Sequence, residues 1–132
     1  MNAEERKCTV VVCDDQKAFR EIVSLMLSVE PGLEVIGEAK DGEEAVRVVS
    51  ELRPDIVLLD IAMPMLDGFE ALPLILESAP LTQVVMLTGF TSTGMRERAL
   101  AGGASIYIEK GTDVSALVAH IRSLCTAGPS QN

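Results

Sequence analysis

The chain has 132 residues, 48% of them hydrophobic, and its 20 acidic against 11 basic residues give a net charge of −9 at pH 7. This length fits one domain with a substantial core, and the acidity argues against direct binding to nucleic acid or to an anionic membrane. Because we find neither a signal-peptide pattern nor an apolar run of membrane-spanning length, we expect a cytoplasmic protein.

The amino-terminal half of the chain alternates twice between an apolar run and an amphipathic run. The apolar runs at 8–13 and 33–39 predict two strands. A capping-box pattern at Asp41 and Glu44 marks the start of the second helix. The expected buried positions are Phe19, Ile22, Val23 and Met26 in the first helix, and Ala45, Val48, Val49 and Leu52 in the second.

The carboxyl-terminal half repeats the alternation three more times. Strands are predicted at 56–60, 83–88 and 105–109. The first of the helices after them is predicted at 69–78, with Pro73 in or near its first turn. The second is predicted at 93–101 and has few apolar residues to anchor it. The third is predicted from 114 onward, with a buried stripe of Val114, Leu117, Val118 and Ile121. We therefore expect one domain at 7–125, with an extension at 1–6 and a linker-like tail at 126–132.

Five strand–helix units predict a parallel sheet, because parallel neighbours need a crossover and the crossover is usually a helix. The strands at 8–13, 56–60 and 83–88 are continuously apolar, as expected where helices cover both faces of a sheet. The other two strands alternate more and suit the edges. The sequence therefore predicts an α/β fold, a flavodoxin-like doubly wound (βα)5 sandwich with the parallel strands in order 2-1-3-4-5.

Polar side chains follow four neighbouring strands of this sheet. They are Asp14 and Asp15, Asp60, Thr88 and Lys110. In an open parallel sheet the functional crevice lies beyond the carboxyl ends of the strands, near the point where the strand order reverses. We therefore expect three carboxylates, a hydroxyl and an ammonium group to share one cleft.

Three close carboxylates repel one another unless their pKa values rise or a cation neutralises them. Mg²⁺, or Mn²⁺ in its place, takes oxygen ligands and commonly binds beside phosphate. We expect Asp14 and Asp15 to hold this ion, with Asp15 as the direct ligand and Asp14 acting partly through water. Asp60 would attack phosphorus and form an acyl phosphate, while Thr88 and Lys110 contact the phosphoryl oxygens.

The chain resembles the receiver domain of two-component response regulators over roughly residues 7–125. The motifs that carry the resemblance are Asp14-Asp15, the run from Asp60 to Gly68 (DIAMPMLDG), Thr88-Gly89 and the run from Tyr107 to Lys110 (YIEK). Each motif alone is weak, but their joint occurrence on five strand–helix units is specific.

This resemblance implies a phosphorylation-controlled signalling switch. A histidine kinase would transfer phosphate to Asp60, and the backbone carbonyl of Ala62 would be a further metal ligand. Thr88 would move toward the phosphate, the ring of Tyr107 would fill the vacated space, and the surface of the fourth helix, fifth strand and fifth helix would change. The chain would be no enzyme beyond promoting its own phosphorylation and dephosphorylation.

One position departs from the family pattern. Lys110 is followed by Gly111, where the family usually has proline. This Lys-Gly pair and the segment 101–104 are similar to the subfamily, related to NarL, whose receivers precede a LuxR-type helix-turn-helix domain. We expect either a free-standing receiver or the front part of a longer transcription regulator, with a homodimer as a possible phosphorylated form.

Other functions are compatible with parts of the pattern. A haloacid dehalogenase-like phosphatase also uses an aspartate nucleophile, but it expects an acid at the position of Ala62. A flavodoxin shares the predicted fold, but Asp14 and Asp15 would repel a flavin phosphate. A receiver that binds partners without phosphorylation stays open.

Some residues also have a purely structural interpretation. Asp15 could be only a helix cap, and His120 is expected on the surface without a role in phosphate chemistry. The three cysteines, Cys8, Cys13 and Cys125, show no metal-ligand spacing and are odd in number, so the pattern favours reduced core thiols and gives a redox role no support.

Overall fold

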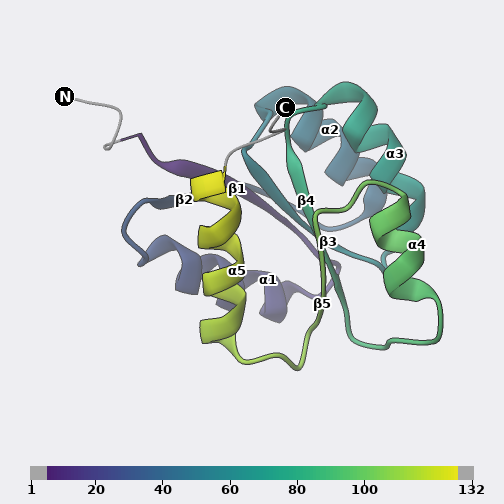
Figure 1. Cartoon of the computed structure of the whole chain (residues 1–132). Helices are drawn as coiled ribbons and strands as arrows, with labels where there is room; N and C mark the ends of the chain where they lie inside the picture. Colours follow the sequence, from purple (N-terminus) through teal and green to yellow (C-terminus); the bar gives the residue numbers. More distant parts are fainter. Residues whose placement is uncertain (1–5, 128–132) are drawn as a thin grey trace.

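The computed structural model describes residues 6–127, and the expected extension at 1–6 and tail at 126–132 lie almost entirely outside that range. The elements in chain order are β1 (Cys8–Cys13), α1 (Lys17–Ser28), β2 (Leu33–Ala39), α2 (Gly42–Leu52), β3 (Ile56–Asp60), α3 (Gly68–Ser78), β4 (Gln83–Thr88), α4 (Met95–Ala101), β5 (Ile106–Glu109) and α5 (Val114–Ala127). All strand pairs are parallel, in the order β2-β1-β3-β4-β5 (Figure 1). The predicted fold and strand order are confirmed.

The sheet has a helical layer on each face. Figure 1 shows α1 and α5 on one side and α2, α3 and α4 on the other. Successive side chains of a strand point to opposite faces, so Val11 of β1 packs in the core under α2 and α3 while Val10 and Val12 pack under α1 and α5. The continuous apolar runs of the central strands are explained by this double cover.

The buried side of α1 differs from the prediction. Val23 and Leu27 are buried and Phe19 packs beside them, whereas Ile22 and Met26 are exposed. The sequence of α1 holds two overlapping apolar stripes. Packing against β1 and β2 selects the stripe of Phe19, Val23 and Leu27, which has i, i+4, i+8 spacing. Ile22, Leu25, Met26 and Val29 are left as an exposed apolar side of α1.

The capping residues of α2 and α3 agree with the sequence pattern, whereas the position of one proline in α3 does not. The Asp41 side chain accepts a hydrogen bond from the Glu44 amide, and Asp67 with Glu70 forms a capping box at α3. Pro73 is the sixth residue of α3 and therefore lies in its second turn, beyond the predicted position. Its side chain is exposed, so the ring does not disturb the core.

The prediction of reduced thiols is wrong for two of the three cysteines. Cys8 and Cys125 form a disulfide, with their Cα atoms 5.9 Å apart, and only Cys13 is a free, buried thiol. The bonded residues are 117 positions apart, so their contact depends on how α5 packs against β1. Burial raises the pKa of the Cys13 thiol well above its usual range, which keeps that group neutral.

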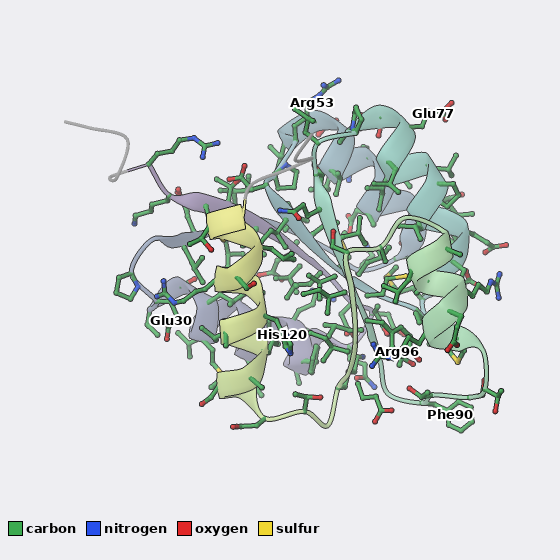
Figure 2. The ribbon with its side chains drawn as sticks, viewed as in Figure 1. Glu30, Arg53, Glu77, Phe90, Arg96 and His120 are labelled. Atoms are coloured by element: carbon green, nitrogen blue, oxygen red, sulfur yellow. A yellow bond between two sulfur atoms is a disulfide. The ribbon has the colours of Figure 1, made fainter. Side chains whose placement is uncertain are left out.

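No helix within residues 6–127 combines the length and the apolar composition that a bilayer crossing requires. His120 lies exposed on α5, as expected (Figure 2).

Candidate functional site

An acidic cluster lies at the carboxyl ends of β1 and β3. The register of these neighbouring strands pairs Cys13 with Leu59, so the residues that follow, Asp14 and Asp60, come side by side. Asp14, Asp15 and Asp60 each offer one carboxylate oxygen within 4.8 Å of the others. The side chains of Asp14 and Asp60 are buried, while Asp15 is exposed. The predicted convergence of three carboxylates is present.

Lys110, directly after β5, supplies the cation of the cluster. Its ammonium nitrogen lies 2.7 Å from Asp14 Oδ2 and 3.5 Å from Asp60 Oδ2. Its backbone amide donates to the carbonyl of Thr88, which anchors the residue to β4 although glycine follows it. The peptide between Lys110 and Gly111 is trans, because the described part of the chain contains no cis peptide.

Two residues of α1 that the sequence analysis did not assign to the site support the cluster. The ring centre of Phe19 lies 4.6 Å from the Lys110 ammonium, a cation–π contact. The Arg20 guanidinium donates to the backbone carbonyl of Asp14 at 2.9 Å and to Glu38 Oε1 at 3.1 Å. Phe19 and Arg20 lie within one to two helical turns of Asp14-Asp15. This closeness in sequence is the only signal that could have identified them.

Asp60 has a strongly perturbed acidity. Desolvation by burial is the main cause, and the neighbouring Asp14 adds to it, while Lys110 and the amide of Ala62 act in the opposite direction. The net effect raises the pKa of Asp60 to about 6. The Ala62 amide donates to Asp60 Oδ1 at 3.3 Å. The role of the Ala62 carbonyl as a metal ligand stays a prediction.

The loop after Asp60 needs a glycine where it turns into α3. The amide of Gly68 donates to the carbonyl of Ile61 at 2.7 Å, and a Cβ at this position would lie 2.6 Å from the Asp60 carbonyl oxygen. Any larger residue would push the backbone that carries Asp60. The Asp67-Gly68 pair is therefore a turn and cap that positions the site without being part of it.

The cluster fits a hard divalent cation. All three carboxylates are oxygen donors, and neither histidine nor cysteine contributes to the group. Asp14 Oδ1 accepts a hydrogen bond from the Gln16 amide, and its buried Oδ2 forms an ion pair with the Lys110 ammonium at 2.7 Å. One ammonium group thus faces three carboxylates, and a divalent cation would balance the remaining negative charge.

The hydroxyl groups of Thr88 and Tyr107 are hydrogen-bonded to the segment that follows β4. The buried Thr88 hydroxyl donates to the Phe90 carbonyl at 2.6 Å and accepts from the Phe90 amide. The Tyr107 ring packs in the core under α2, α3 and α4, and its hydroxyl lies 2.9 Å from Thr91 Oγ1. Figure 2 labels Phe90 in the loop between β4 and α4, so both contacts tie this loop to the sheet.

Comparison with known proteins gives a family match over most of the chain. Residues 10–122 match a family model described as the response regulator receiver domain. The chain is 35% identical over 124 residues to the transcriptional regulatory protein DegU of Brevibacillus brevis, which covers 94% of this chain and 52% of that protein. It is 41% identical over 108 residues to a protein-glutamate methylesterase/protein-glutamine glutaminase of Thermotoga maritima, which covers 80% of this chain and 31% of that protein. The chain thus spans about half or less of the length of these relatives.

Solved structures agree with the family match. The response regulator domain of Thermotoga maritima CheB is 36% identical, with a TM-score of 0.86 over 94% of this chain and 100% of that one. The signal receiver domain of NarL from Mycobacterium tuberculosis is 32% identical, with a TM-score of 0.85 over 93% of this chain and 98% of that one. These matches favour the receiver prediction over the phosphatase and the flavodoxin.

Proposed function

The chain belongs to the response regulator receiver family, and on that premise we propose that Asp60 accepts a phosphoryl group from a histidine kinase in a magnesium-dependent reaction. The observation that carries this proposal is the gathering of Asp14, Asp15, Asp60 and Lys110 at one edge of the sheet. The pKa of Asp60, about 6, leaves most of its carboxylate ionised and nucleophilic at neutral pH.

The transfer is a substitution at phosphorus. A carboxylate oxygen of Asp60 attacks the phosphorus of a phosphohistidine, the new O–P bond forms, and the P–N bond breaks with its electron pair returning to the histidine nitrogen. Lys110, already within reach of Asp60, would pair with a phosphoryl oxygen once transfer is made. The product is an acyl phosphate on Asp60.

The residues that would hold Mg²⁺, or Mn²⁺ in its place, are Asp14, Asp15, Asp60 and the carbonyl of Ala62. The bound ion would supply positive charge that allows a dianionic phosphoryl group to approach three carboxylates. Asp15 is the exposed member, and Asp14 is already engaged by the Gln16 amide and Lys110. Asp15 would therefore ligate the ion directly and Asp14 partly through water.

Phosphorylation would change the surface of α4, β5 and α5. For Thr88 to contact a phosphoryl oxygen, its hydroxyl must give up the hydrogen bond to the Phe90 carbonyl, which frees the loop before α4. Tyr107 is already buried, so the expected change is the loss of the contact between its hydroxyl and Thr91. The switch would then alter the partner-binding surface rather than the core.

The partners follow from this reaction. The exposed apolar side of α1 is formed by Ile22, Leu25, Met26 and Val29. It begins one to two helical turns after Asp14-Asp15 and would contact the kinase that delivers the phosphoryl group. The net charge of −9 gives no basis for direct nucleic-acid binding.

The output we propose is transcriptional control, in the cytoplasm, through a DNA-binding domain outside this chain, with residues 7–125 as the receiver. Support comes from DegU, a transcriptional regulatory protein of which the chain matches only 52%. A homodimer would form on phosphorylation. The alternative is a receiver that binds its partner without phosphorylation, and it predicts the same dimerisation and partner affinity with and without a phosphoryl mimic.

Intact-mass spectrometry after incubation with acetyl phosphate and Mg²⁺ tests the proposal. The wild-type chain should gain one phosphoryl group, and Asp60→Asn or chelation of the metal should prevent the gain. Asp67→Asn, in the same loop but outside the cluster, is the matched control and should be phosphorylated normally. Failure of the folded wild type to gain mass, or an equal gain in Asp60→Asn, would refute the assignment.

A further inference from the structure

The disulfide joins the two ends of the domain on the side opposite the acidic cluster. Cys8 is the first residue of β1, whereas Asp14 follows the last, and Cys125 lies in the last turn of α5. In Figure 1 this last turn of α5 lies next to the start of β1. The bond is thus remote from the proposed phosphorylation chemistry and has no role in it.

The bond is accessible to small reagents. Both cysteines are only partly buried and line a cavity of about 770 Å³. Arg6, Arg53 and Arg122 also line this cavity. Arg6 is ion-paired with Asp55 and Arg122 with Glu30, so Arg53 is the cation of the lining for which the described residues show no ion pair. The positive charge of Arg53 beside the partly buried disulfide would attract anionic thiolates, which are the species that attack disulfide sulfurs. The cavity therefore suits an anionic low-molecular-weight thiol.

Contacts other than the disulfide also hold α5 on the sheet. Leu117 and Ile121 anchor α5 in the core, and both are buried. The last turns are also held by Arg122, which donates to Glu30 Oε1 and to the Pro31 carbonyl, both at 2.9 Å, and by Gln83, which donates to the Leu124 carbonyl. Opening the disulfide would therefore release one constraint on the end of α5 and leave the sandwich folded.

From this accessibility and this redundancy we infer that Cys8 and Cys125 are a redox-active pair, a modification site whose reaction partner is an anionic low-molecular-weight thiol. Two such thiols would reduce the bond. One thiolate attacks a protein sulfur and forms a mixed disulfide, the second attacks that mixed disulfide, and the products are two cysteine thiols and one small-molecule disulfide. The reverse reaction with that small disulfide closes the bond, so electrons and protons balance without another reactant.

The third cysteine is a built-in control. Cys13 is buried at the far end of β1 and its thiol stays neutral, so it should react with neither the thiol nor a labelling reagent in the folded protein. Any change of thiol count in the native state then reports on Cys8 and Cys125 alone.

A titration of the whole chain with mixtures of glutathione and glutathione disulfide tests the inference. Maleimide labelling and intact mass should show two thiols that open and close together and reversibly, while Cys13 becomes reactive only after unfolding. Hydrogen exchange at residues 122–127 should accelerate about tenfold on reduction, with the central strands unchanged. The midpoint of thermal unfolding should fall by roughly 5–15 °C on reduction.

Cys8→Ser and Cys125→Ser should each show the exchange pattern of the reduced protein at every glutathione ratio, whereas Cys13→Ala should still titrate. Three results would overturn the inference. The bond could open with glutathione only after unfolding, it could fail to form, or hydrogen exchange at residues 122–127 could be equal in both redox forms. Phosphorylation by acetyl phosphate should proceed in both forms, so this inference and the proposed function can fail separately.

Discussion

The ammonium group of Lys110 lies over the ring of Phe19, 4.6 Å from its centre. Lys110 comes from the end of β5 and Phe19 from α1, so the contact joins two elements on either side of the acidic cluster. Where the family usually follows its lysine with proline, this chain has Gly111. We interpret Phe19 as a positioning residue that holds the ammonium near Asp14 and Asp60.

Phe19→Leu should therefore slow phosphorylation by acetyl phosphate about two- to thirtyfold, because a cation–π contact contributes about 0.5–2 kcal/mol, depending on how far it is desolvated. The measurement is the rate of phosphoryl gain at saturating Mg²⁺. Phe69→Leu is the matched control, since the Phe69 ring makes a cation–π contact with Arg98 on the other face of the sheet. Equal rates in the two variants would contradict the positioning role of Phe19.

Arg20 holds the loop that carries the acidic pair. Its guanidinium bridges the Asp14 carbonyl and Glu38, and removing it should let the loop move away from Asp60. Arg20→Gln should weaken Mg²⁺ binding about tenfold, as is typical for residues that orient metal ligands. Arg122→Gln removes an equivalent bridge, between Glu30 and the Pro31 carbonyl, and should leave Mg²⁺ affinity unchanged in the same calorimetric titration.

Asp14 and Asp15 should contribute unequally to metal binding. Asp15 is exposed and free to turn toward an ion, whereas Asp14 is engaged by the Gln16 amide and lies against Lys110. Asp15→Ala should weaken Mg²⁺ binding by about tenfold or more, and Asp14→Ala should weaken it less. Titration calorimetry on both variants, with Asp67→Asn as a control outside the cluster, decides the order, and the reverse order would reject this division.

The raised pKa of Asp60 predicts a pH-dependent stability. Because the folded state holds the proton of Asp60 up to a pH of about 6, against an ordinary value of 3.8, stability is lost as pH rises between these values. Above pH 6 the ionised carboxylate destabilises the fold by a constant amount, about 3 kcal/mol before screening. Asp60→Asn removes this cost.

In urea unfolding without divalent metal, Asp60→Asn should therefore be more stable than the wild type at pH 7.5 and similar to it at pH 4. Adding Mg²⁺ at pH 7.5 should stabilise the wild type and narrow the difference. Glu34→Gln, at an exposed carboxylate on β2, is the control and should show no such change. The same difference between Asp60→Asn and wild type at both pH values would count against a buried, perturbed Asp60.

Much of the fold could be predicted because its signals are local. Continuous apolar runs such as Ile56–Leu59 mark strands covered on both faces, and a carboxylate at the end of such a run has no place in a core unless it serves a site. The strand order and the convergence of Asp14, Asp15 and Asp60 follow from these signals and from the rules for parallel sheets.

What escaped prediction depends on tertiary packing. The predicted buried side of α1 is confirmed at Phe19 and Val23 and wrong at Ile22 and Met26, because the helix holds two overlapping apolar stripes and only docking on β1 and β2 decides between them. The disulfide was missed because Cys8 and Cys125 are distant in sequence, and their approach is set by the packing of α5. The contact of Phe19 with Lys110 could not be predicted for the same reason, because only the packing of α1 brings the ring to Lys110.

The most direct test of the central claim is to locate the acyl phosphate. After reaction with acetyl phosphate and Mg²⁺, the modified side chain is trapped by borohydride reduction and identified by peptide mass spectrometry. We predict modification at Asp60 alone. The modification should require the metal ion, and its yield should fall when Lys110 is replaced by alanine. Modification at Asp14, Asp15 or Asp67 with Asp60 unchanged would contradict the account.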